Sequence, residues 1–193
     1  MNGFLTILVS IRMKMISLSI LVALTATLSA ETFREVVRDS SGRIAQTIDR
    51  QKSSDGSVQS VTRDASGRII GTATTRPISG GSAQTTYRDA SGRLAGSASS
   101  QGTTSGGSST TYRDASGRMA GSASTHKSTG TSSTQFRDAS GRLSGSETTH
   151  GSSSGTATST KRDASGRLIG SSSGSGKCPS GVRVPSPPAG AKK

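Results

Sequence analysis

Twelve arginines stand in six pairs, and four residues separate the two members of each pair. A guanidinium group presents several N–H donors in a fixed plane, which suits bidentate binding of phosphate, sulfate or carboxylate groups. Because the pairs recur along the chain, a folded array would offer a polyanion many binding points at once. The candidate polyanion-binding residues are Arg38, Arg43, Arg63, Arg68, Arg88, Arg93, Arg113, Arg118, Arg137, Arg142, Arg162 and Arg167.

Each arginine pair encloses a four-residue core of nearly the same sequence, so the chain contains a tandem repeat. The first copy reads R-D-S-S-G-R at residues 38–43, and the other five read R-D-A-S-G-R. Successive copies start 25, 25, 25, 24 and 25 residues apart. This regularity indicates an array of six structural units of about 25 residues each.

The hexapeptide predicts a tight reversal of the backbone. Its Asp accepts a hydrogen bond from the backbone two residues on, its two small residues suit right-handed positions, and its Gly suits a left-handed one. A type I turn followed by a left-handed Gly is a three-residue β-hairpin loop with a bulge. Asp89 lies opposite Arg93 in this register, so we expect the two charges to help close the turn. The predicted turn-forming residues are Asp39, Gly42, Asp64, Gly67, Asp89, Gly92, Asp114, Gly117, Asp138, Gly141, Asp163 and Gly166.

The segments beside each turn are typical of short strands, because Thr, aromatic and aliphatic residues roughly alternate in them. A single hairpin is marginally stable in water, so neighbouring hairpins must pair. The sequence therefore predicts an all-β fold in which tandem β-hairpins form an antiparallel meander or an open β-spiral, with partly disordered linkers and tail. The last two repeats contain few large apolar residues, so we expect looser order there.

The composition limits how large a core this chain can fill. Ser, Thr and Gly make up 89 of the 193 residues, and Trp is absent. After residue 30, only 20 of 163 residues are Val, Ile, Leu, Met, Phe or Tyr. Burial of so few apolar groups cannot offset the ordering cost of a conventional enzyme fold. Disorder of much of the chain is the alternative to the hairpin array.

The first 30 residues have the composition of a secretory signal peptide. A basic start at Lys14 precedes an apolar run over residues 16–28, and small residues follow up to Ala30. The alternative is one uncleaved anchor that also includes the apolar residues 4–11, although the main run is shorter than the roughly 20 residues of a membrane-spanning helix. We expect a secreted, periplasmic or cell-surface protein without a stable membrane span after cleavage.

The predicted organisation has three parts. Residues 1–30 form the signal peptide, residues 31–173 form the six-copy hairpin array, and residues 174–193 form a flexible tail rich in Gly, Pro and Lys. The tail contains Cys178, which excludes an intrachain disulfide because it is the one cysteine. The sequence leaves open the role of this thiol and whether translation starts at Met1 or at Met13.

The other residues with chemical potential do not form a catalytic pattern. His126 and His150 stand in Ser/Thr/Gly linkers without further metal ligands at a suitable spacing. Ser105 and Ser153 lie in low-complexity stretches and lack the strand-to-helix context of a nucleophile. The turn Asp residues have two arginines in each hexapeptide, which opposes calcium binding. We therefore predict no catalytic, cofactor or metal site, and a protein that is not an enzyme.

The stretch Tyr87–Leu94, which reads Y-R-D-A-S-G-R-L, resembles the YD repeat of Rhs-type bacterial proteins, whose pattern is Tyr-Asp-two residues-Gly-Arg-Leu. That resemblance implies β-hairpins that wind into a spiral. The sequence is also similar to short secreted bacterial proteins with R-D-A/S-S-G-R repeats and no assigned activity. These resemblances imply hairpin structure and no particular function.

The charge points to anionic partners. The formal net charge is +13, or +11 after residue 30, and such an excess favours association with anionic surfaces. We expect a secreted non-enzymatic repeat protein with a structural or surface-interaction role. The alternative is a polyanion-binding module for lipopolysaccharide, acidic glycan or nucleic acid that acts through the arginine pairs. Nucleic acid is the least favoured because few aromatic residues offer stacking; another protein partner, self-association by sheet edges and the oligomeric state stay open.

Overall fold

Each hexapeptide turn joins two antiparallel strands, and the six hairpins together give twelve strands. The computed structural model describes residues 31–151 and 155–176. The predicted signal peptide and Cys178 lie outside these residues. In chain order the strands are β1 (Thr32–Asp39), β2 (Ile44–Lys52), β3 (Val58–Asp64), β4 (Ile69–Ile78), β5 (Ser82–Asp89), β6 (Leu94–Gly102), β7 (Ser108–Asp114), β8 (Met119–Ser128), β9 (Thr131–Asp138), β10 (Leu143–Gly151), β11 (Ala157–Asp163) and β12 (Leu168–Gly176).

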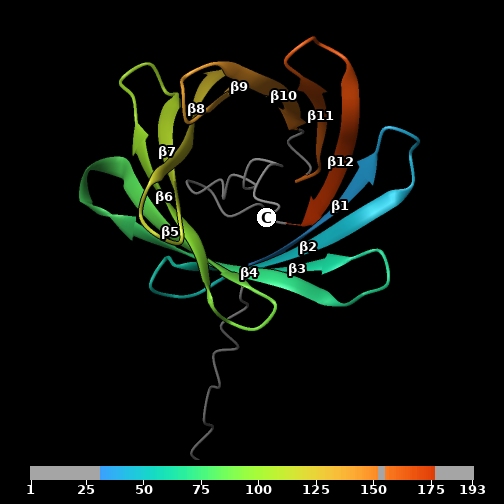
Figure 1. Ribbon diagram of the computed structural model, residues 1–193, viewed down its shortest axis with the longest axis horizontal. Helices are drawn as coiled ribbons and strands as arrows, with labels where there is room; N and C mark the ends of the chain where they lie inside the picture. The colour runs from blue at the N-terminus through green and yellow to red at the C-terminus, as the bar shows by residue number, and fades with distance from the viewer. Residues whose placement is uncertain (1–30, 152–154, 177–193) are drawn as a thin grey trace, which may run out of the picture.

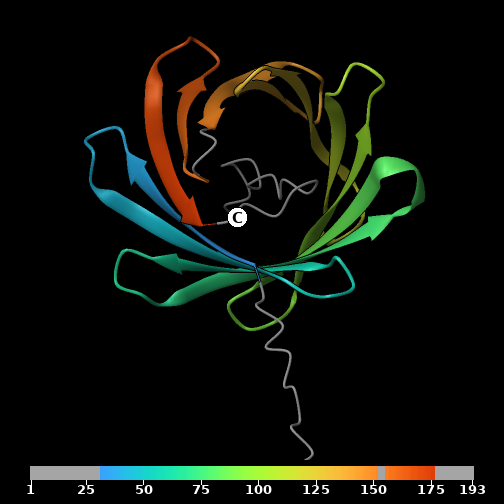
Figure 2. The same ribbon diagram turned by 180° about the vertical axis from the view of Figure 1, so that it is seen from behind.

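The sheet closes on itself. Every strand pairs with its neighbours in sequence, and β1 also pairs antiparallel with β12, from Phe33 opposite Gly176 to Asp39 opposite Gly170. The two strands lie side by side in both views of the barrel (Figures 1 and 2). The all-β, hairpin-linked architecture is confirmed, but the prediction of an open meander or spiral is wrong. Closure pairs the backbone groups that two sheet edges would leave unpaired, so the described strands offer no free edge for self-association.

The linkers between hairpins are ordered turns in the part of the chain that the structure describes. Residues 53–57 and 103–107 repeat the hydrogen-bond pattern of the hexapeptide turn, with Gly56 and Gly106 in the left-handed region at φ 80° and 78°. A short 3-10 turn, η1 (Ser79–Gly81), connects β4 to β5. The expected disorder of these linkers is therefore wrong where they are described, because Gly supplies the conformation that a tight reversal needs.

Strand order does not decline toward the end of the array. The ladders of β9 with β10 and of β10 with β11 each contain seven residue pairs, as does the ladder of β1 with β2. The strand β12 reaches Gly176, so its last three residues fall within the stretch that the sequence analysis assigned to the tail. The expected loosening of the last repeats is not found in their strands, because backbone pairing and closure against β1 do not depend on large side chains.

The core lies on the inner wall of the barrel and is sparse. Its buried cluster consists of Ala98, Tyr112, Ala123 and Phe136, with Tyr87 packed against it. Many of the other buried side chains are Ser and Thr. Tyr87, Tyr112 and Phe136 come from three successive repeats, so in this part of the barrel one aromatic residue per repeat packs among small side chains.

Candidate functional site

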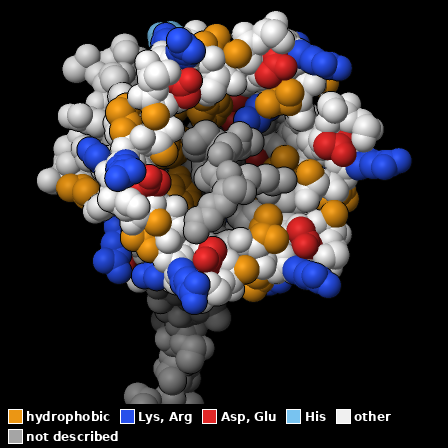
Figure 3. All heavy atoms as spheres, in the orientation of Figure 1, with side chains coloured by type: hydrophobic (Ala, Val, Ile, Leu, Met, Phe, Trp, Pro, Cys, Tyr) orange, Lys and Arg blue, Asp and Glu red, His pale blue; other side chains and the backbone are white. Residues whose placement is uncertain are grey.

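The topology gathers all six hexapeptides at one end of the barrel. Consecutive antiparallel strands reverse direction at each turn, so the hexapeptide turns share one end and the connections between hairpins share the other. In Figure 3 basic and acidic side chains recur around this mouth of the barrel. We call the six hexapeptides together the arginine rim; it comprises residues 38–43, 63–68, 88–93, 113–118, 137–142 and 162–167.

The turn at Asp89 shows how each hexapeptide folds. The Gly92 amide donates to the Asp89 carbonyl at 3.0 Å, and the Asp89 amide donates to the Arg93 carbonyl at 3.0 Å. Gly92 has a φ of 82°, in the left-handed region that favours glycine. The same backbone bonds and a positive φ recur at the other five glycines of the rim. The backbone around every arginine pair therefore has the same turn geometry.

The Asp side chain is occupied by the turn itself. One carboxylate oxygen of Asp89, Oδ1, accepts from the amides of Ser91 and Arg93, both at 2.9 Å, and from the Ser91 hydroxyl at 2.7 Å. The two amide bonds recur in all six turns. These donors, the Ser91 hydroxyl first, lower the pKa of Asp89 because they stabilise the charged form.

The expected attraction between Asp89 and Arg93 takes a different form from an ion pair. Asp89 accepts from the backbone amide of Arg93, whereas the ion pairs among the described residues are Arg34–Asp49, Arg50–Glu35 and Lys52–Glu31. All three lie outside the arginine rim. The backbone amides sit within reach of the carboxylate at no cost in side-chain freedom, so they take the place of the guanidinium.

The two arginines of each hexapeptide differ in their contacts. The first, represented by Arg88, donates from Nη1 to the Gly92 carbonyl at 2.8 Å, and this bond recurs in all six turns. The second, represented by Arg93, makes no side-chain hydrogen bond or ion pair with any described residue. The rim thus carries six guanidinium groups braced on their turns and six that are available to an external anion.

Most of the net charge of the described chain lies in the arginine rim. The described residues include 18 Lys and Arg and 11 Asp and Glu, a net charge of +7. The rim holds 12 of these arginines and six of the acids, so it contributes +6. The rest of the barrel is therefore nearly neutral, and the molecule has one strongly basic end.

A second group of charges lies inside the barrel, and no sequence pattern predicted it. The Arg50 Nη1 and Glu35 Oε2 atoms are 2.6 Å apart, with side chains 11% and 17% exposed, and Arg50 also stands 5.8 Å from the centre of the Phe33 ring. These residues fall outside the hexapeptide, so the repeat gave no signal for them. Because Arg50 has both an acidic neighbour and an aromatic partner, this group stabilises the wall and does not form an anion site.

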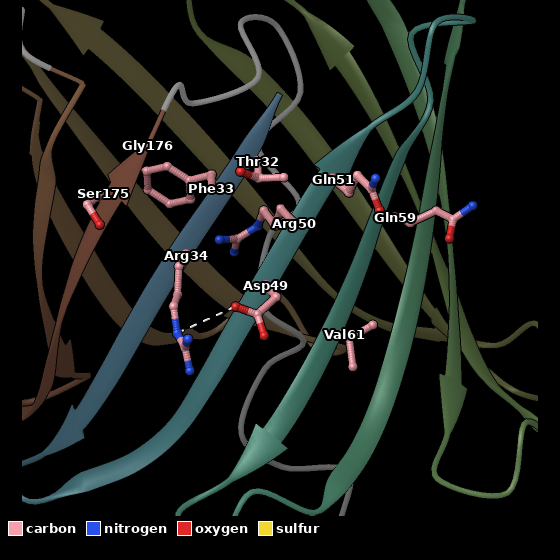
Figure 4. A pocket seen from close by; sticks show the side chains of 10 residues that line it. All are labelled: Thr32, Phe33, Arg34, Asp49, Arg50, Gln51, Gln59, Val61, Ser175 and Gly176. Atoms are coloured by element: carbon pink, nitrogen blue, oxygen red, sulfur yellow. Dashed lines mark ion pairs between the residues drawn. The ribbon is translucent and has the colours of Figure 1, made fainter. Parts of the chain in front are cut away.

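A hollow of about 510 Å³ is lined by residues of β1, β2, β3 and β12, and Figure 4 shows its lining. Arg34 and Asp49 form an ion pair there at 3.5 Å between Nε and Oδ1, and the Arg34 side chain is 64% exposed. Gln59 and Val61 complete this side of the lining. Arg50 also lines the hollow and is paired with Glu35, so both arginines there have an acidic partner. The hollow shares no residue with the arginine rim.

The remaining candidates do not come together in the described chain. His150 contacts Thr131 through Nδ1 at 3.2 Å, and His126 lies on β8, two strands away. Ser105 lies in a tight turn, whereas Ser153 falls outside the described residues. The described residues contain no group of three metal-ligating side chains.

Among the described residues there is also no helix with the length and apolar character to cross a membrane. Comparisons with protein-family models, with curated proteins and with solved structures return no match to this chain.

Proposed function

We propose that this chain is a secreted, non-enzymatic surface-interaction protein that binds anionic polymers or surfaces through the arginine rim. The observation that carries this proposal is the concentration of +6 of the +7 net charge of the described residues at one end of the barrel. The predicted signal peptide favours extracytoplasmic partners such as acidic glycans and lipopolysaccharide.

The ring geometry supports multivalent binding. Each exposed arginine contact with an anion is weak and is screened by salt. The rim repeats the contact around a closed ring, so a polymer that has bound one hairpin meets the next at a high effective concentration. The affinity for a polyanion should therefore rise more than proportionally with the number of arginines in the rim, and it should fall steeply as the ionic strength rises.

The position of the aromatic residues argues against a single-stranded nucleic acid. Proteins that bind single strands generally stack bases on exposed aromatic side chains. Tyr112 and Phe136 are only 3% and 6% exposed, and Tyr87 packs against them on the inner wall. The arginine rim therefore offers phosphate contacts without a stacking platform, which favours glycan sulfates, carboxylates and lipid phosphates.

A salt-titrated binding measurement on immobilised heparin tests the proposal. The rim variant R43Q/R93Q/R142Q and the off-rim variant R34Q/R76Q/K127Q each remove three positive charges, so net charge is matched. We expect the rim variant to lose about tenfold or more in affinity and to show a shallower salt dependence, while the off-rim variant stays close to the unmodified protein. Equal losses in both variants, or no salt-sensitive binding by the unmodified protein, would overturn the proposal and leave a purely structural role.

A further inference from the structure

Six exposed aliphatic side chains accompany the arginine rim. One follows the second arginine of every hexapeptide, and each is between 43% and 48% exposed. Six of the nine large apolar side chains that are exposed in the described chain belong to this set. We call them the aliphatic ring; its members are Ile44, Ile69, Leu94, Met119, Leu143 and Leu168.

The register places each member of the aliphatic ring beside an arginine. Leu94 is the cross-strand partner of Arg88, and Met119 is the partner of Arg113. The same pairing holds in the other four hairpins. Because all six hairpins end at the same mouth of the barrel, cationic and aliphatic side chains stand together around it, and Figure 3 shows hydrophobic side chains among the basic ones there.

From this juxtaposition we infer that the partner of the arginine rim is an anionic lipid surface, which the barrel meets mouth first. This inference rests on the proposed anion binding and specifies the class of partner. A soluble acidic glycan would satisfy the guanidinium groups but would leave the aliphatic ring in water. At a bilayer surface the arginines lie at the level of the lipid phosphates, and the aliphatic side chains enter the boundary of the acyl chains.

The two features complement each other at a membrane. A basic patch alone gives weak, salt-sensitive attraction, and a few apolar side chains alone give marginal binding, whereas the combination retains a protein at an anionic leaflet. A second copy of the chain is a poor occupant of the same mouth, because two rims of +6 each would repel. The charge therefore selects an anionic surface over self-association.

Vesicle sedimentation separates this inference from the proposed function. The purified protein and the variant I44S/I69S/L94S/M119S/L143S/L168S are each titrated with vesicles of phosphatidylcholine, with and without phosphatidylglycerol, and with heparin. We expect the variant to lose about tenfold or more in affinity for the anionic vesicles and to keep its affinity for heparin. Unchanged vesicle binding would overturn the lipid inference alone, whereas failure of the unmodified protein on both heparin and vesicles would overturn the proposed function.

A single-site probe covers the case in which the sixfold variant does not fold. In a C178S background, a polarity-sensitive fluorophore is attached at M119C in the aliphatic ring or at I78C, an equally exposed site at the opposite end of the barrel. We expect a blue shift of emission at M119C, and none at I78C, when phosphatidylglycerol vesicles are added. Identical spectra at the two sites, or no shift at M119C, would overturn the inference.

Discussion

Tyr112 lies directly opposite Gly121 on the inner faces of β7 and β8, and its side chain is only 3% exposed. The same relationship joins Tyr87 to Gly96. A Cβ atom at Gly121 or at Gly96 would collide with the backbone of the strand on its other side, so the missing side chain lets that strand approach closely. In each of these hairpins the aromatic residue therefore fills the interior, and the glycine opposite it admits the backbone of the next strand.

Substitution of Gly121 tests the close approach of β9 to this glycine. A Cβ atom at Gly121 would lie 2.5 Å from the Arg137 carbonyl oxygen, so G121A forces the neighbouring strand to move. We expect a loss of about 1–3 kcal/mol in the free energy of unfolding, measured with urea. The control is G151A, because a Cβ at Gly151 meets no atom within 4 Å, and it should change stability by less than about 0.5 kcal/mol. Equal effects of the two substitutions would contradict the close approach.

Removal of the Tyr112 hydroxyl tests the burial of an unpaired polar group. Tyr112 Oη is buried without a hydrogen-bond partner among the described residues. Y112F should therefore leave the free energy of unfolding unchanged or raise it by up to about 1 kcal/mol, while Y112A should lower it by about 3–5 kcal/mol. Destabilisation by Y112F of more than about 1 kcal/mol would mean that the hydroxyl has a partner in solution.

How far the sequence predicts this structure depends on the range of the interaction. The turn around Asp89 and Gly92 follows from neighbouring residues, so its backbone geometry could be derived from local rules. Closure depends on pairing between Phe33 and Gly176, which stand at opposite ends of the array, and no local pattern fixes that register. The apolar content set an upper limit on the size of the core. It did not show that a barrel can form with mainly small residues on its inner wall.

The sequence predicted which residues belong to the candidate site, but it did not predict their arrangement in space. The six pairs of arginines were evident as repeats, whereas their collection at one mouth requires the up-and-down topology. The interior ion pair of Arg50 with Glu35 had no sequence signal because neither residue recurs in the other repeats. Arg93 attracts Asp89 as expected and helps to lower its pKa, but the carboxylate accepts a hydrogen bond from the Arg93 backbone amide and forms no ion pair with the guanidinium.

Alkaline titration gives a pH test of the folded interior. The chain has two tyrosines, Tyr87 and Tyr112, and burial raises the pKa of both. A raised folded-state pKa stabilises the barrel fully below the unfolded value of about 10, and this contribution is lost as pH rises above it. Tyrosinate absorbance should therefore appear only together with loss of the β-sheet circular dichroism signal. Titration of a tyrosine near pH 10 with the circular dichroism unchanged would contradict burial.

Acid titration gives the opposite test at the arginine rim. Hydrogen bonds from the Ser hydroxyls and the amides lower the pKa of Asp64, Asp89 and Asp138 in the folded state. A lowered pKa stabilises the barrel above the unfolded value of about 3.9, and this contribution is lost as pH falls below it. The Tm of the unmodified protein should fall steeply below about pH 4, and the Tm of D64N/D89N/D138N should start lower and depend less on pH. Parallel curves for the two proteins would show that these carboxylates do not stabilise the turns.

The arginine rim and the aliphatic ring both require a closed barrel. The distance between the first and last strands measures closure directly. Spin labels are placed at R34C and S175C, which are cross-strand partners on β1 and β12, in a C178S background. The closed barrel predicts a label separation below about 20 Å, whereas an open sheet of twelve strands would separate these edges by about 50 Å at a spacing of about 4.8 Å per strand. A double electron–electron resonance distribution dominated by short distances is the expected result; one centred near the longer distance would contradict the ring and the functions proposed for it.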